Sequence, residues 1–82
     1  MEVRLSKSAE KYYLAQDAVA RSRIKSGLAG LQNEPMAGDI VPVESRPGMY
    51  RLRIGKLRIL FEKADDIIKV TKIDSRGQVY KK

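Results

Sequence analysis

The stretch that decides the fold is residues 49–62, MYRLRIGKLRILFE, which predicts a β-hairpin. Apolar and polar residues alternate along both halves of it, as they do in strands with one buried face. Gly55-Lys56 is a two-residue turn with glycine first, the preference of type II′ turns. With this turn Ile54 faces Leu57, and the pairing continues outward from there. One face of the hairpin is then apolar and consists of Tyr50, Leu52, Ile54, Leu57, Ile59 and Phe61.

The other face of the hairpin carries Arg51, Arg53, Arg58, Leu60 and Glu62. In the predicted register Arg53 lies directly opposite Arg58, and like charges in that position destabilise a hairpin by up to ~1 kcal/mol. We therefore expect that removing Arg58 does not unfold the protein. Guanidinium groups gathered on one face are suited to phosphate, because each offers a planar fork of donors. The alternative is an ordinary solvated outer face.

The segments before this hairpin predict one strand and two helices. Residues 2–5 alternate as a strand does, and apolar spacings of three and four predict helices over about 7–16 and 18–32. Ser6 or Ser8 can cap the first helix and Asp17 the second. The tyrosines of the first helix are interpreted as packing residues.

The remaining segments predict a loop and a last strand. Residues 34–48 contain all three prolines and are predicted to be a long loop. A third strand of the meander runs over 67–73, where Lys72 breaks the alternation and indicates a bulge or a strand end. Together these segments predict one α+β domain over residues 1–82. In it, a helix hairpin covers one face of a four-stranded sheet made of the N-terminal strand and a three-stranded antiparallel meander.

Composition and charge narrow the function. The chain has no cysteine and no histidine, which excludes disulfides, Cys/His zinc sites and His-dependent nucleophiles. No apolar run approaches the ~18 residues of a membrane span, and we expect a cytoplasmic protein. Residues 1–45 hold six Lys/Arg and six Asp/Glu, whereas residues 46–82 hold eleven and four, so the whole net charge of +7 lies in the second half. This asymmetry indicates a polyanionic partner.

Three stretches resemble the RelE/ParE superfamily of toxins from bacterial and archaeal type II toxin–antitoxin systems. Residues 49–62 resemble its YR-x-R-x-G-x-x-R-x-x-F/Y hairpin, and residues 76–80, RGQVY, resemble its C-terminal R-G-x-V-Y. Residues 8–35 resemble its helix hairpin. The resemblance implies a toxin neutralised by a cognate antitoxin. RelE-like members cut mRNA on the ribosome, whereas ParE-like members inhibit DNA gyrase without cutting nucleic acid.

The hairpin favours the RelE branch and implies a set of site residues. Catalytic roles carried over by motif fall on Arg53, Arg58, Arg76 and Tyr80. RNA-binding roles are expected for Arg46, Arg51, Lys56, Lys81 and Lys82. The basic residues of the second strand are often lysines in RelE-like enzymes and are arginines here. Before Arg76 the chain has Asp74-Ser75, where many relatives place another basic residue or a histidine.

The expected reaction is metal-independent cleavage of ribosome-bound mRNA by its own 2′-hydroxyl. Arginines can stabilise the charged transition state but are poor general bases, so Tyr80 is the candidate for proton transfer or for stacking on a base. No cofactor is expected, and the expected partners are the antitoxin, the ribosome and mRNA. The alternatives are a ParE-type gyrase inhibitor and a member that only binds its antitoxin.

Overall fold

The computed structural model describes residues 2–33 and 35–75 of the chain. Within them, β1 (Glu2–Leu5) leads into two helices, α1 (Lys7–Leu14) and α2 (Ala18–Leu31). Both helices begin at the residues that their caps predict. Ser6 Oγ accepts a hydrogen bond from the Ala9 amide at 3.1 Å, and Asp17 Oδ1 accepts one from the Ala20 amide at 2.9 Å.

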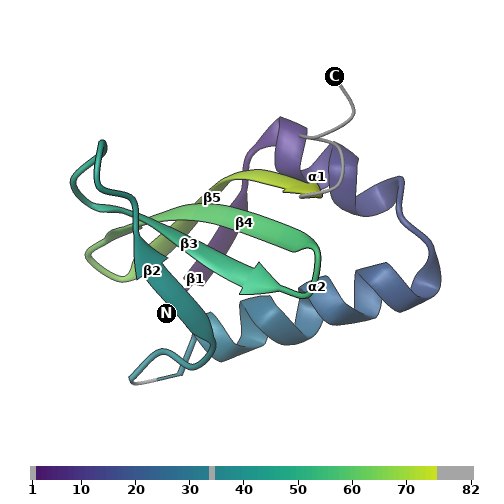
Figure 1. Cartoon of the computed structure of the whole chain (residues 1–82), viewed down its shortest axis with the longest axis horizontal. Coiled ribbons are helices and arrows are strands. Elements are labelled where there is room, and N and C mark those ends of the chain that lie inside the picture. The colour runs from purple at the N-terminus through teal and green to yellow at the C-terminus, as the bar shows by residue number, and fades with distance from the viewer. Residues whose placement is uncertain (1, 34, 76–82) are drawn as a thin grey trace.

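The strands form one five-stranded sheet with the order β1-β5-β4-β3-β2. Neighbouring strands are antiparallel except β1, which runs parallel to β5 (Figure 1). The strands after the helices are β2 (Asp39–Pro42), β3 (Met49–Ile54), β4 (Leu57–Ala64) and β5 (Ile67–Ser75). The α+β class, the helix hairpin and the meander are confirmed.

The predicted count of four strands is wrong, because β2 lies inside the segment that was assigned to a loop. This strand has only four residues and ends in Pro42, and it pairs antiparallel with β3 along one side. Proline cannot donate to a strand ladder, so it is confined to edges such as this one. A four-residue edge strand is too short to show a clear alternation of polar and apolar residues. The three prolines of the segment also favoured its assignment to a loop.

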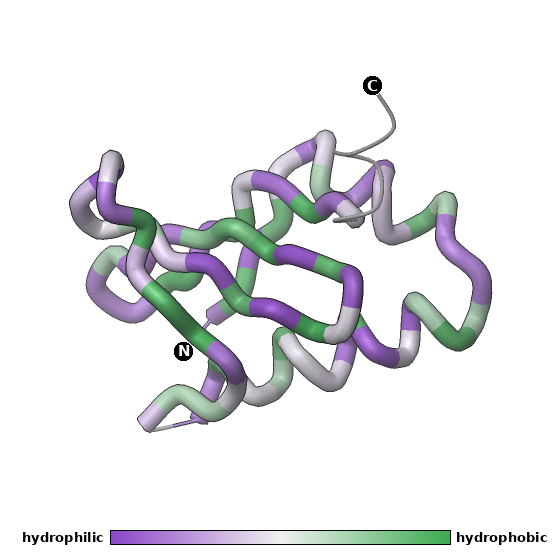
Figure 2. Tube along the Cα trace, in the orientation of Figure 1, coloured by the Kyte–Doolittle hydropathy of each residue, from purple (hydrophilic) through white to green (hydrophobic). Residues whose placement is uncertain are grey.

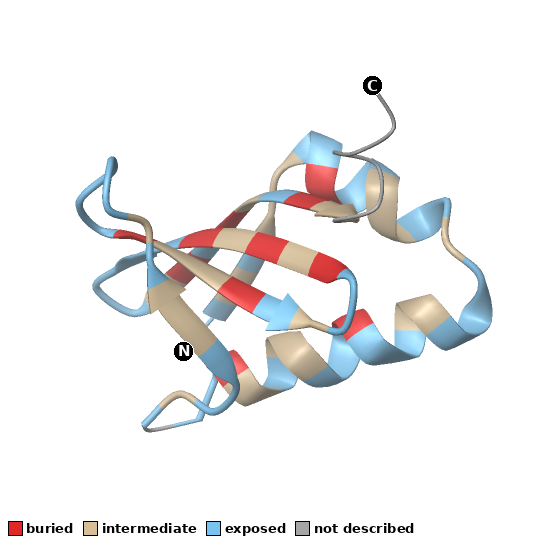
Figure 3. Ribbon diagram, in the orientation of Figure 1, coloured by how far each residue is buried: buried red, intermediate tan, exposed pale blue. Residues whose placement is uncertain are grey.

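The core lies between the helices and the inner face of the sheet. Ile24 and Leu31 of α2 are fully buried, as are Ile59 and Phe61 of β4. Hydrophilic and hydrophobic residues alternate along the second half of β3 (Figure 2), and buried residues alternate with more exposed ones along most of β4 (Figure 3). Burying such side chains contributes roughly 1.5–3 kcal/mol each. The opposite face of the sheet carries the arginines of the hairpin, with Leu60 among them.

The irregularity at Lys72 is a bulge in β5. Leu60 pairs with Lys72 and Phe61 pairs with Val70, so Thr71 has no partner across the strands. The Thr71 hydroxyl donates to the Leu60 carbonyl oxygen at 3.3 Å, which keeps the extra residue bonded. Because one extra residue reverses the alternation, Ile73 turns into the core and is 3% exposed.

Candidate functional site

The polar face of the sheet carries four charged residues in one row across four strands. Arg53 on β3 faces Arg58 on β4, as the sequence predicts. Asp39 on β2 faces Arg53 from one side, and Asp74 on β5 faces Arg58 from the other. We call Asp39, Arg53, Arg58 and Asp74 the charge row.

The expectation of an uncompensated repulsion between the two arginines is wrong. Arg53 Nε donates to Asp39 Oδ2 at 3.2 Å, whereas Arg58 donates from Nε and Nη2 to the two oxygens of Asp74 at 3.1 and 3.3 Å. The missed strand β2 supplies the first carboxylate. The bulge brings the second to the polar face, because without it the alternation of β5 would place Ile73 there.

The two ion pairs of the charge row differ in exposure. The Arg53 and Asp39 side chains are 46% and 55% exposed, whereas those of Arg58 and Asp74 are 28% and 19% exposed. An exposed pair contributes ~0–1 kcal/mol, and a two-contact guanidinium–carboxylate pair shielded from water is held more firmly. The Arg58 guanidinium is therefore held more firmly than that of Arg53.

Arg51 lies on the same face as Arg53, one alternation along β3. Its side chain is half-buried, and its Nε is buried without a hydrogen-bond partner among the described residues. Arg51 and Arg53 line a hollow of about 590 Å³ with the segment 41–45, which contributes two valines, a proline, a serine and the carboxylate of Glu44. In this hollow the guanidinium groups can bind the phosphate of a nucleotide, and the apolar side chains can pack against its base.

The other predicted site residues lie outside the charge row or outside the described chain. Arg46 lies in the turn before β3 and Lys56 in the turn after it, so these exposed cations stand at opposite ends of that strand. The predicted Arg76, Tyr80, Lys81 and Lys82 lie outside the described residues. Among the described residues, the structure therefore brings together Arg51, Arg53 and Arg58.

A tyrosine of α1 lies within electrostatic reach of this face. Burial, and to a lesser extent the Asp74 carboxylate, raises the pKa of Tyr12. Tyr12 also packs against the core, which agrees with the packing role that its position predicts. It therefore keeps its proton near neutral pH.

Two carboxylates of the site, Asp39 and Asp74, were missed from the sequence. The signal for Asp39 was the Gly38-Asp39-Ile40-Val41 stretch, where a turn residue precedes a short β-branched pair. No local signal identifies Asp74 as a partner of Arg58, because that contact depends on the bulge. Among the described residues, no group of three or more acids is placed to hold a metal ion.

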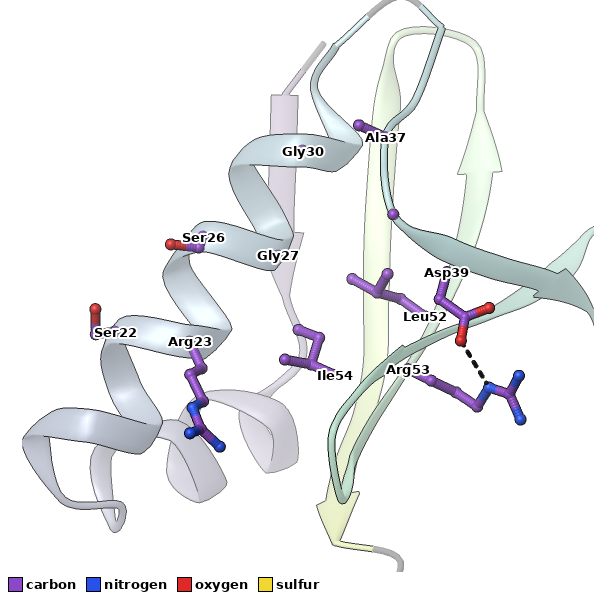
Figure 4. Close-up of a pocket in the computed structure, with 11 residues that line it drawn as sticks. Ser22, Arg23, Ser26, Gly27, Gly30, Ala37, Asp39, Leu52, Arg53 and Ile54 are labelled. Atoms are coloured by element: carbon purple, nitrogen blue, oxygen red, sulfur yellow. Dashed lines mark hydrogen bonds and ion pairs between the residues drawn. The ribbon is translucent and has the colours of Figure 1, made fainter.

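A second hollow, of about 410 Å³, lies between α2 and the β2–β3 pair (Figure 4). Gly27 of the helix lies next to Leu52 and Ile54 of β3, and Ser22, Ser26 and Gly30 also line the hollow. Arg53 lines both hollows, and Figure 4 shows its guanidinium meeting the Asp39 carboxylate at the rim. The exposed ion pair thus stands between the two.

Comparison with known proteins gives one family and one fold. The family model described as the ParE toxin of the type II toxin–antitoxin system, parDE, matches residues 3–80. No curated protein gives a match. In the described residues, neither helix has the length and apolar character that crossing a membrane requires.

Solved toxin–antitoxin complexes contain chains of similar fold. In the archaeal RelE–RelB complex from Pyrococcus horikoshii OT3, the matched chain is 24% identical, with a TM-score of 0.79 over 94% of this chain and 96% of that one. The match in the RelB–RelE complex from Methanococcus jannaschii is 23% identical, with a TM-score of 0.75 over 93% of each chain. The E. coli RelBE complex gives 15% identity and a TM-score of 0.74 over 90% of this chain and 94% of that one.

Proposed function

The chain belongs to the ParE toxin family of type II toxin–antitoxin systems, within the RelE/ParE superfamily, and on that premise we propose that it is a ribosome-dependent mRNA endonuclease. It is the toxin component of such a system, and its partner in the resting cell is a cognate antitoxin. The proposed target is mRNA held on the ribosome, which places the activity in the cytoplasm.

The observation that carries this proposal is the gathering of Arg51, Arg53 and Arg58 on one polar sheet face, beside a hollow. Guanidinium forks match the oxygens of a phosphodiester, and charged donors held in place stabilise the charge that develops during its cleavage. The similar fold of RelE chains in their complexes with RelB is consistent with this reading.

The proposed reaction uses the nucleophile that RNA itself supplies. The 2′-oxygen attacks the adjacent phosphorus, the bond from phosphorus to the 5′-oxygen breaks, and a proton passes from the 2′-oxygen to the leaving 5′-oxygen. Arg58, fixed by Asp74, stabilises the phosphorane, and Arg53 binds its non-bridging oxygens. Tyr80 remains the candidate for the proton transfer. The ribosome aligns the mRNA, and such alignment can contribute ~7–11 kcal/mol in the best cases.

A second candidate is inhibition of DNA gyrase without nucleolysis. It is favoured by the family model, which describes a ParE toxin, and by the two carboxylates that neutralise the charge row. An Asp at position 74 lowers the positive potential where an RNA-cleaving site needs it.

Toeprinting of mRNA on translating ribosomes tests the proposal against this alternative. We expect purified protein to cut ribosome-bound mRNA and to leave free RNA almost intact. The variant Arg53→Ala should cut at least tenfold more slowly, a loss of about 1.4 kcal/mol or more of transition-state stabilisation. Lys63→Ala, which removes an exposed cation at the far end of β4, should cut normally. Intact mRNA together with inhibited gyrase supercoiling would establish the second candidate instead.

A further inference from the structure

The two ion pairs of the charge row hold their arginines in different ways. Asp74 engages two nitrogens of Arg58 in a shielded position, whereas Asp39 engages only Nε of Arg53. Among the described residues, Asp39 is the hydrogen-bond partner of the Arg53 side chain. The terminal nitrogens of Arg53 therefore remain available at the rim between the two hollows.

The Asp39 carboxylate occupies the Nε donor of Arg53. It presents an anionic oxygen to a guanidinium at 3.2 Å, the contact that a phosphodiester oxygen would make. Asp39 is the first residue of an edge strand, and its side chain is 55% exposed. Losing its partner would leave it in water rather than buried, so the exchange costs little.

We propose that Asp39 is a displaceable counter-ion that occupies Arg53 in the free protein and gives way to an RNA phosphate. This inference rests on the proposed function, because it takes RNA as the anion. It assigns Asp39 the role of an internal competitor that weakens RNA binding. Asp74, by contrast, keeps Arg58 in place and is not displaced.

Binding of a short RNA that cannot be cleaved tests this assignment. The probe is a fluorescently labelled oligomer with 2′-O-methyl groups throughout, and its anisotropy is measured at one fixed salt concentration. Asp39→Asn is compared with Asp66→Asn, which changes the net charge equally in the exposed β4–β5 turn, six pairs along the ladder from the charge row. We expect Asp39→Asn to bind about two- to fivefold more tightly than Asp66→Asn, the range that an exposed ion pair allows.

The double variant separates competition from general electrostatics. If Asp39 acts by occupying Arg53, Asp39→Asn should bind no more tightly than Asp66→Asn once Arg53→Ala has been made in both, as in a double-mutant cycle. Equal affinities of Asp39→Asn and Asp66→Asn would overturn the inference, as would a gain that persists without Arg53. Absence of any RNA binding by the wild type would overturn the inference, whereas the proposed function is decided by cleavage of mRNA on ribosomes. If the variants bind RNA as expected but the protein does not cut mRNA on ribosomes, the proposed nuclease activity is wrong and the role of Asp39 as a counter-ion is supported.

Discussion

Replacing Arg58 with alanine tests whether this arginine stabilises the fold through its ion pair with Asp74. The substitution leaves the Asp74 carboxylate, 19% exposed, without its two-contact partner, and Lys72 at 4.0 Å remains its nearest cation. Breaking a buried pair costs ~3–5 kcal/mol and an exposed one ~0–1 kcal/mol, so this half-buried pair should cost about 1–3 kcal/mol. For a domain of this size, that corresponds to a fall in melting temperature of roughly 4–24 °C.

Thermal melts followed by circular dichroism at neutral pH and low salt measure this loss. Arg53→Ala is the matched comparison, because it removes the same side chain from the exposed pair and should lower the melting temperature by only a few degrees. Arg58→Lys keeps the charge and loses the fork, so it should fall between the wild type and Arg58→Ala. Equal stability of Arg58→Ala and the wild type would refute the reasoning and would restore the view that the opposed arginines repel without compensation.

Three further predictions concern packing, pH and the antitoxin. Gly30→Ala should destabilise by ~1–3 kcal/mol in urea unfolding, because a Cβ there would lie 2.8 Å from the Ala37 carbonyl oxygen; an unchanged midpoint would mean that the loop yields freely. Since folding raises the pKa of Tyr12, the folded state binds more protons than the unfolded state at alkaline pH, and stability should fall as pH rises above about 10. Tyr12→Phe should reduce that fall in melts taken across pH 8–11, and an identical slope would contradict the shift. Binding of the antitoxin should weaken as salt rises, because the net charge of +7 lies in residues 46–82, and a titration that is flat in salt would show that charge does not govern the interface.

Local chemistry was enough to predict the hairpin and the helices. A two-residue turn at Gly55-Lys56 allows one pairing of its flanking strands, so the opposition of Arg53 and Arg58 follows from the turn alone. Ser6 and Asp17 bind amides three residues away, and such caps need no distant partner. The resemblance to a toxin family also rested on these stretches, and the family model agrees with it.

Tertiary structure decided which charges the arginines meet. The strand β2 is too short to be favoured by its own sequence and exists because β3 offers an unpaired edge, which brings Asp39 to Arg53. The bulge at Thr71 exists because Ile73 gains free energy by entering the core, and the same shift turns Asp74 toward Arg58. Both carboxylates are far from their arginines along the chain, so only the assembled sheet determines that one guanidinium is held more firmly than the other.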